Sequence, residues 1–244
     1  MGFFDKIFGQ NEKIEQPKET AHLPSVPTCK TEQDLIEQFG GYAFDKQIAL
    51  GEIIGDKDWN VDMGKGEISF GADLVFPIQV LGTFSHSSQT WLWAWANTSS
   101  GLPENILKQA KQLKKYGVEN DIDLLSINRF DATNPDLHLI GSVASGMFNT
   151  SGYYIADYGE GAMLVTLQIE QIENIPKDDH HRILTVFPQL ISQFEMNHNL
   201  GLTNYLTAKG YHISENGAKL VASKNGQTIT AEFDELSRLT KLNG

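Results

Sequence analysis

Three tryptophans alternate with aliphatic residues in the segment Trp91-Leu-Trp-Ala-Trp-Ala-Asn97. A β-strand points successive side chains to opposite faces, so this spacing predicts that all three indoles share one face of a sheet. Indole rings stack on sugars, bases and cations, and each ring keeps one N–H donor. If that face is open, it forms the aromatic wall of a ligand pocket; if it is covered, it forms core.

Polar residues near this strand could complete such a pocket. His86 lies in the loop that leads into the strand, Asn97 ends the strand, and Asp62 ends a predicted strand upstream. A tryptophan buries roughly 150–250 Å², so three covered indoles would dominate the core. This favours core over pocket, and the pocket remains the alternative. The candidate ligand-binding residues are Trp91, Trp93, Trp95, Asn97, His86 and Asp62.

Signals for catalysis or metal binding are weak. Asp62, Asp73, Asp157 and Glu160 lie at predicted strand ends or turns. Any two could form an acid–base pair, but turn formation also explains all four. Asp178-Asp179-His180-His181 is the only dense group of metal-capable side chains. Neighbouring helical residues point about 100° apart, so capping of a helix start is the favoured explanation of this group.

Glycine-containing segments match no phosphate-binding or nucleophile motif. Gly64-Lys-Gly66 and Gly159-Glu-Gly161 are predicted hairpin turns, without the lysine-hydroxyl pair of a P-loop. The sequence contains no Gly-x-Ser-x-Gly nucleophile elbow. We therefore predict no catalytic residue, no metal and no cofactor, and the sequence leaves open whether the protein is an enzyme.

The composition is that of an acidic globular protein. The 244 residues are 40% hydrophobic and 20% charged, with a formal net charge of −12. Such acidity disfavours nucleic acid as a partner and suits a basic protein, although acidity also simply keeps proteins soluble. The single cysteine, Cys29, excludes an intramolecular disulfide and fits the reducing cytoplasm. No apolar run reaches the length of a membrane-spanning helix, and no secretory signal pattern is present.

The first nine residues carry four large apolar side chains on one side of a short helical pattern: Phe3, Phe4, Ile7 and Phe8. One interpretation is a weak contact with a membrane surface or a partner. The favoured alternative is that the segment docks on its own protein or frays, because nine residues are too few to be helical alone in water. The proline-containing residues that follow, up to residue 30, are predicted to be an extended linker.

Four consecutive strands with short connections predict an antiparallel sheet. A hairpin joins residues 59–62 to residues 67–70, and two longer strands follow at 75–84 and 90–96. A later hairpin is predicted over residues 153–169, around a glycine-containing turn.

Helices are predicted around these strands. Thr31 and Asp34 resemble a capping pair that opens a helix with an uneven apolar face, which Gly40-Gly41 should weaken or kink. A second helix is predicted from Pro103 to about Gly117, with a buried stripe that could cover the indoles. A third is predicted over residues 134–147.

The C-terminal region is predicted to be a small unit of its own. Apolar residues recur at helical spacing over residues 178–197, where Pro188 should kink the helix or mark its start. A helix over 199–209 precedes strands separated by Asn216-Gly217 and Asn225-Gly226, which are strong hairpin signals. The last segment, 232–242, could be a hairpin or a helix, and the neighbouring turns favour the hairpin.

One group of motifs resembles a known family. Leu81-Gly-Thr83, followed by the tryptophan segment and by Leu102-Pro103, is similar to a bacterial family classed as a domain of unknown function. Further matching features are Trp59-x-Val-Asp62 with its glycine turn and Phe70, and Gly152-Tyr-Tyr154 with its downstream glycine turn. The resemblance spans roughly residues 31–170. It implies no known activity, so no functional residue can be transferred from it.

These observations predict a cytoplasmic bacterial α+β protein with a mainly antiparallel sheet covered by helices. The expected organisation is an apolar segment and linker (1–30), a main domain (31–175), a bridging helix (176–198), and a small helix plus β-meander unit (199–244). The favoured function is a non-catalytic binding module with a basic protein partner. The alternatives are an enzyme or small-molecule binder with a tryptophan-walled pocket, and attachment to a membrane surface through residues 1–9.

Overall fold

The structure of the protein is a computed structural model, which describes residues 26–169, 172 and 179–244. The apolar segment 1–9, most of the expected linker and Asp178 lie outside the described residues. Helices and two antiparallel sheets make up the described chain, which confirms the predicted α+β class. Among the described residues, no helix combines the length and the apolar character needed to cross a membrane.

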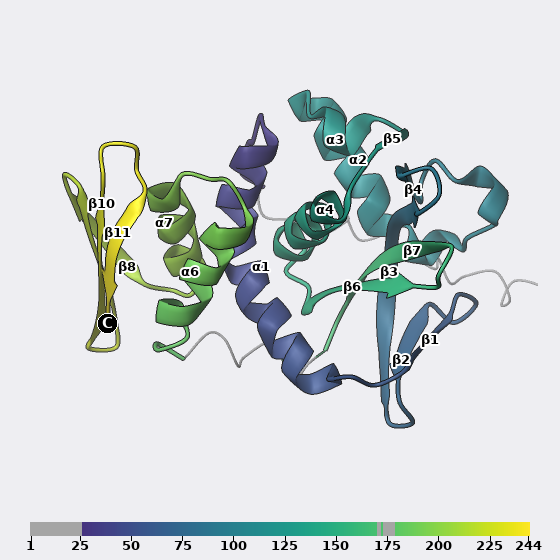
Figure 1. The fold of residues 1–244 in the computed structure, drawn as a ribbon, viewed down its shortest axis with the longest axis horizontal. Helices are drawn as coiled ribbons and strands as arrows, with labels where there is room; N and C mark the ends of the chain where they lie inside the picture. The colour runs from purple at the N-terminus through teal and green to yellow at the C-terminus, as the bar shows by residue number, and fades with distance from the viewer. Residues whose placement is uncertain (1–25, 170–171, 173–178) are drawn as a thin grey trace, which may run out of the picture.

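Helix α1 (Glu32–Ile54) lies at the boundary between two lobes of the molecule (Figure 1). We call residues 26–169 the main lobe and residues 179–244 the C-terminal lobe. Thr31 and Asp34 form the predicted capping box. Leu35 belongs to the core of the main lobe, whereas Phe44 belongs to the core of the C-terminal lobe. The apolar face is uneven because α1 is buried on two sides.

Helix α1 runs unbroken through Gly40-Gly41, where the sequence predicted a weaker or kinked helix. A Cβ atom added at Gly41 would lie 2.4 Å from the Cβ atom of Tyr205 in helix α7 (His198–Ala208). The missing side chain therefore lets α7 approach α1 closely. Here close packing outweighs the low helix propensity of glycine.

A seven-stranded antiparallel sheet forms the main lobe, and it contains both predicted hairpins. The long strand β3 pairs with β2 near its start, with β4 near its end, and with β7 along its other edge. The strands are β1 (Trp59–Asp62), β2 (Glu67–Phe70), β3 (Leu74–Ser85), β4 (Thr90–Trp93), β5 (Arg129–Asp131), β6 (Gly152–Asp157) and β7 (Gly161–Leu167).

The expectation of a tryptophan strand from Thr90 to Ala96 is wrong at its end, because β4 stops at Trp93. Trp91 and Trp93 are fully buried, as the favoured core interpretation requires. Trp95 lies in the following turn, is only partly buried, and stacks on Trp93 with ring centroids 6.5 Å apart. Because the chain turns after Trp93, Trp95 does not continue the alternation of β4.

Helices pack around the sheet. Helix α4 (Asn134–Met147) lies between α1 and the sheet (Figure 1), and its apolar residues share a core cluster with Trp91 and Trp93. Helix α2 (Lys108–Asn120) starts later than predicted because a 3-10 turn (Glu104–Ile106) follows Pro103. A short helix, α3 (Asp123–Ser126), completes the covering.

In the C-terminal lobe, helices α6 (Ile183–Gln193) and α7 lie between α1 and a four-stranded sheet (Figure 1). The predicted helix over 178–197 is too long, since α6 ends before Phe194, whose backbone is extended. The predicted hairpins are confirmed, and the last segment is a strand. The strands are β8 (His212–Asn216), β9 (Lys219–Lys224), β10 (Gln227–Phe233) and β11 (Leu239–Asn243).

Candidate functional site

Two of the predicted site residues, Trp91 and Trp93, have no exposed surface. The indole N–H of Trp93 donates to the carbonyl oxygen of Leu124 at 3.1 Å. A Cβ atom at Gly82 of β3 would lie 2.4 Å from the Trp91 ring, so the glycine makes room for this indole. Both rings are therefore enclosed by their own protein.

Trp95, Asn97 and Asp62 make local contacts. The Nζ atom of Lys114 lies 4.0 Å from the centroid of the Trp95 ring, so the protein's own cation already occupies that face. Asn97 accepts a hydrogen bond from the Ser99 hydroxyl at 3.1 Å. Asp62 accepts from the backbone N–H of Lys65 at 3.0 Å, which lowers the pKa of Asp62 and holds the β1–β2 turn. These contacts do not gather the three residues into one site.

His86 is brought into a site by a strand pairing. Strands β3 and β7 pair up to Ser85 and Gly161, which sets the β3–β4 turn beside the β6–β7 turn. His86 Nε2 lies 3.1 Å from Asp157 Oδ2, and the backbone N–H of His86 donates to the carbonyl oxygen of Glu160 at 3.2 Å. Sequence reasoning named Asp157 and Glu160 as candidate acids but could not place them beside His86.

A cavity of about 560 Å³ lies at these two turns. We call it, together with Asp157, the hairpin site. Its lining is Ser85, His86, Ser87, Tyr158, Gly159 and Glu160. Tyr158 is an exposed aromatic residue, with 54% of its surface accessible to solvent.

The His86–Asp157 pair of the hairpin site is open to solvent. The His86 side chain is 38% exposed and that of Asp157 is 58% exposed. The backbone N–H of Gly159, at 2.8 Å, and then His86 hold the pKa of Asp157 below its usual range. Water screens an exposed pair strongly, so a ligand group can replace either partner at small cost.

The hairpin site contains the residue types of a nucleophile system but not its contacts. In such systems a base contacts the nucleophile while a carboxylate orients the base. The hydroxyls of Ser85 and Ser87 instead lie 3.2 Å from each other. Within the described part of the chain, no hydroxyl hydrogen bonds to the His86 ring. The described contacts therefore turn the His86 ring toward Asp157 and the two serine hydroxyls toward each other.

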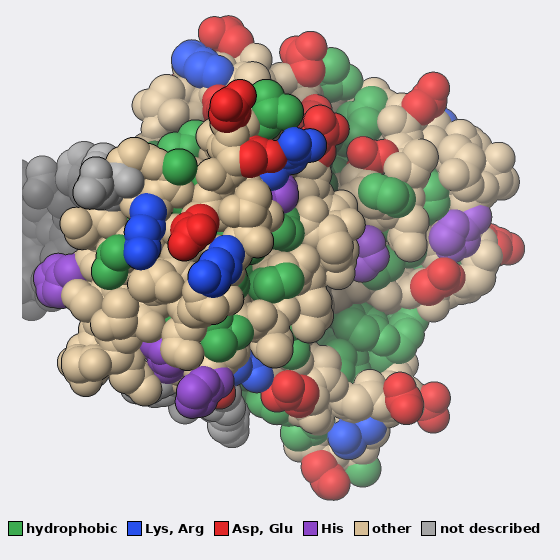
Figure 2. Space-filling view, turned by 60° about the vertical axis from the view of Figure 1, so that its left-hand side comes forward, with side chains coloured by type: hydrophobic (Ala, Val, Ile, Leu, Met, Phe, Trp, Pro, Cys, Tyr) green, Lys and Arg blue, Asp and Glu red, His purple; other side chains and the backbone are tan. Residues whose placement is uncertain are grey.

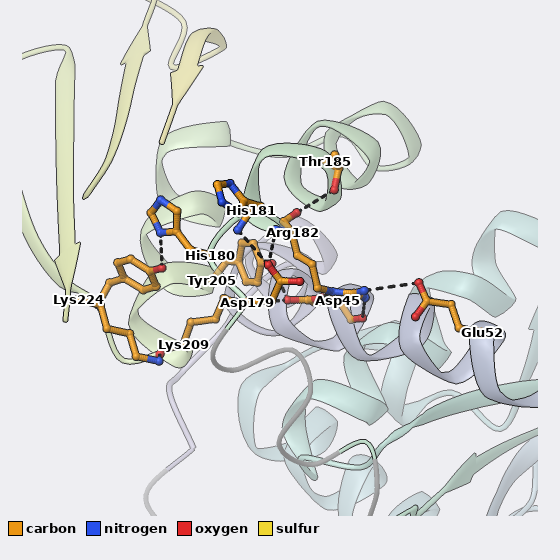
Figure 3. A network of polar contacts seen from close by, with 11 residues as sticks. Asp45, Glu52, Asp179, His180, His181, Arg182, Thr185, Tyr205, Lys209 and Lys224 are labelled. Carbon is orange, nitrogen blue, oxygen red and sulfur yellow. Dashed lines mark hydrogen bonds and ion pairs between the residues drawn. The ribbon is translucent and has the colours of Figure 1, made fainter. Parts of the chain in front are cut away.

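A second polar cluster, which the sequence did not indicate, joins the two lobes (Figure 3). Asp45 Oδ1 accepts from Arg182 Nε at 2.8 Å. Asp45 Oδ2 accepts from the Tyr205 hydroxyl at 2.7 Å and from Lys209 Nζ at 2.8 Å. We call these four residues the buried network. Asp45 comes from α1, whereas its three donors come from the C-terminal lobe.

Solvent is excluded from the centre of the buried network. The side chains of Asp45 and Lys209 have no exposed surface. Burial lowers the pKa of Lys209, although Asp45 opposes this effect. Burial, followed by the charge of Asp45, raises the pKa of Tyr205 well above its ordinary value. Both oxygens of Asp45 are already hydrogen bonded, so this carboxylate serves the fold and not a solute.

The predicted aspartate–histidine cluster has structural contacts where it is described. His180 Nδ1 lies 2.8 Å from the Tyr211 hydroxyl. Asp179 accepts from the backbone N–H groups of His181 and Arg182, at 3.0 and 3.3 Å. Over residues 26–169, 172 and 179–244, no group of three or more His, Cys, Asp or Glu side chains could hold a metal ion. Figure 2 shows histidine side chains at several separate places on the face that it draws.

Comparison with known proteins bears on the main lobe. A search of curated proteins and a search of solved structures found no match. A family model described as a family of unknown function (DUF6882) matches residues 33–168, which is more than half of the chain. The match contains the hairpin site and Asp45 but not Arg182, Tyr205 or Lys209. The chain therefore belongs to this family of unknown function, DUF6882.

Proposed function

We propose that this chain is a non-catalytic binding module and that its ligand contacts the hairpin site. The observation that carries the proposal is a cavity of about 560 Å³ whose walls include His86 and the exposed Tyr158, with Asp157 beside it. Cavities of roughly 300–1,000 Å³ are typical of ligand sites. The mutual contact of Ser85 and Ser87 supports binding over catalysis.

The chemistry of the hairpin site favours a basic protein partner. Asp157 and Glu160 supply carboxylates, and the half-exposed ring of Tyr158 stands next to them. A lysine or arginine side chain attracts both carboxylates and the face of an aromatic ring. The net charge of −12 would steer such a partner toward the protein.

The proposal includes a cellular compartment. We place the module in the cytoplasm, because its single cysteine, Cys29, is free and fits a reducing compartment. The bacterial origin rests on the sequence resemblance alone.

A peptide titration tests the proposal. A fluorescently labelled lysine-rich peptide is titrated with the full chain at physiological ionic strength, and its anisotropy is recorded. We expect saturable binding that Asp157→Asn with Glu160→Gln weakens by about tenfold. The matched control is Asp56→Asn with Asp58→Asn, which removes the same charge from exposed positions in the α1–β1 loop. Equal weakening by both double variants, or by neither, would contradict the proposal.

A small-molecule binder or enzyme is the second candidate. Its specific support is the His86–Asp157 pair at 3.1 Å beside two serine hydroxyls. Treatment with a fluorophosphonate, followed by mass spectrometry, distinguishes it from a binding module. Labelling of Ser85 or Ser87 that disappears in His86→Ala would support an enzyme, and an unlabelled protein supports the binding module. The tryptophan-walled form of this candidate has little support, because Trp91 and Trp93 are fully buried.

A further inference from the structure

A second cavity, of about 430 Å³, lies where the described chain begins. Its apolar side is formed by Val26, Tyr116, Met147 and Phe148, and Lys115 and Glu119 stand on its rim. The four apolar residues are half-buried, so each keeps surface toward the cavity. We call it the docking cavity. It is separate from the hairpin site, and the inference that follows does not depend on the proposed function.

Tyr116 fixes the start of the described chain to the wall of the docking cavity. Its hydroxyl donates to the carbonyl oxygen of Pro27 at 2.6 Å and accepts from the backbone N–H of Cys29 at 2.8 Å. A tyrosine hydroxyl keeps its proton at neutral pH, and burial raises the pKa of Tyr116 further, to about 12, so this hydroxyl is a donor. Residue 26 is therefore held beside the cavity, and residues 1–25 continue the chain from that point.

The first nine residues have the composition that this cavity requires. Phe3, Phe4, Ile7 and Phe8 are apolar, and Asp5 and Lys6 lie among them. The cavity has an apolar floor and a rim on which Lys115 and Glu119 pair at 3.7 Å. Asp5 and Lys6 of the segment can therefore pair with Lys115 and Glu119 of the rim, while the phenylalanines pack against the apolar residues of the cavity.

The connection is long enough for an intramolecular contact. Sixteen residues, 10–25, separate the segment from residue 26, and the r.m.s. end-to-end distance of a polypeptide of that length is about 20–24 Å. The cavity lies beside residue 26. A tether of this length gives an effective concentration in the millimolar range, which favours the chain's own segment over a free competitor.

We propose that residues 1–9 dock in the docking cavity of the same chain, with their apolar side chains against Tyr116, Met147 and Phe148. The segment covers a half-buried apolar surface between α2 and the end of α4.

Photo-crosslinking in the full chain tests this contact directly. Phe4 is replaced by p-benzoylphenylalanine, the protein is irradiated at low concentration, and crosslinked peptides are identified by mass spectrometry. We expect intramolecular crosslinks to residues 112–120 or 147–148. The same photoreactive residue at position 13 is the matched control, and it should give few crosslinks to these residues. Crosslinks from position 4 to other regions, or only between two chains, would overturn the proposal.

Hydrogen exchange gives a second readout that does not depend on photochemistry. The full chain is compared with a variant in which Phe3, Phe4, Ile7 and Phe8 are replaced by serine. Faster amide exchange at residues 116–120 and 146–149 in the variant is expected, with the hairpin site unchanged. Unchanged exchange at both cavity walls would overturn the proposal.

The wild-type chain is also measured with vesicles of phosphatidylglycerol and phosphatidylcholine. If exchange at these residues in the wild-type chain becomes faster only after vesicles are added, a membrane competes with the docking cavity for the segment. If exchange in the wild-type chain is already as fast without vesicles as in the serine variant, docking is contradicted.

Discussion

Asp157 at the hairpin site pairs with an imidazole and Asp45 in the buried network pairs with an arginine and a lysine, and the surroundings of the two aspartates are opposite. The Asp157 side chain is 58% exposed and meets one imidazole, whereas Asp45 has no exposed surface and accepts from Arg182, Tyr205 and Lys209. An exposed pair contributes little to stability and can exchange partners. A buried pair is strongly coupled to the fold, because removal of one member leaves an uncompensated charge without water.

The two clusters also differ in where their members lie along the chain. The whole hairpin site falls within the part matched by the family model, residues 33–168. The buried network takes Asp45 from that part and its donors from the C-terminal lobe. We infer that the hairpin site serves recognition, and that the buried network holds the C-terminal lobe against α1 (Figure 3).

The largest expected effect is that of Lys209→Met in the buried network. The substitution leaves Asp45 with less compensation in a region without water, so we expect the free energy of unfolding to fall by about 3–5 kcal/mol. Urea unfolding followed by circular dichroism measures the change. Lys108→Met, at an exposed position of α2, is the control and should change stability by less than about 0.5 kcal/mol. A loss at Lys209 as small as the control's would contradict the comparison.

Tyr205→Phe should have the next largest effect. It removes only the hydroxyl that donates to Asp45 at 2.7 Å. A hydrogen bond to a charged group contributes about 1.5–3 kcal/mol, so the free energy of unfolding should fall by that amount. The same urea experiment measures it, with Tyr158→Phe at the hairpin site as the matched control. An equal loss in the two phenylalanine variants would mean that the clusters do not differ as described.

Acidification should destabilise the protein before the carboxylates titrate. Burial lowers the pKa of His138, His180 and His198, so the unfolded chain binds more protons than the folded chain below about pH 6.5. Stability should therefore fall from pH 7 toward pH 5, by at most about 1.4 kcal/mol per pH unit for each histidine. Urea unfolding at several pH values measures the slope. His180→Gln should reduce it, and a flat or inverted slope in the wild-type chain would refute this assignment.

The smallest effect on stability is expected at the hairpin site. His86→Ala removes a pair that is largely exposed, so the midpoint of urea unfolding should stay within the error of the measurement. Peptide anisotropy should nevertheless change in the same variant, because the ring lines the cavity. A large drop in the unfolding midpoint would show that His86 serves the fold, and the two clusters would then be alike.

Local signals in the sequence predicted much of the fold. The Asn216-Gly217 and Asn225-Gly226 turns and the capping pair of α1 depend on neighbouring residues, so they could be recognised without the rest of the chain. The end of β4 was missed because the residues after Trp93 form a turn with hydrogen bonds inside it. In this turn the Ala96 N–H donates to the Trp93 carbonyl oxygen at 3.0 Å. Strand periodicity does not report such a turn.

The site was harder to predict because its contacts are distant in sequence. His86 was singled out from its place before the tryptophans, but its partner Asp157 depends on the register of β3 and β7. Asp45 and Lys209 are 164 positions apart, and no local pattern links them. The one signal in the sequence was that Asp45 is a charged residue in a helix, α1, whose turns before and after it carry apolar residues and glycine.

One matched pair of substitutions tests the central claim most directly. Asp45→Asn and Asp157→Asn make the same chemical change, and each variant is measured for urea unfolding and for binding of the lysine-rich peptide. We predict that Asp45→Asn lowers the unfolding midpoint strongly, while the protein that remains folded still binds the peptide. Asp157→Asn should leave the midpoint unchanged and weaken binding. Equal losses of stability, or weaker binding only in Asp45→Asn, would contradict the account.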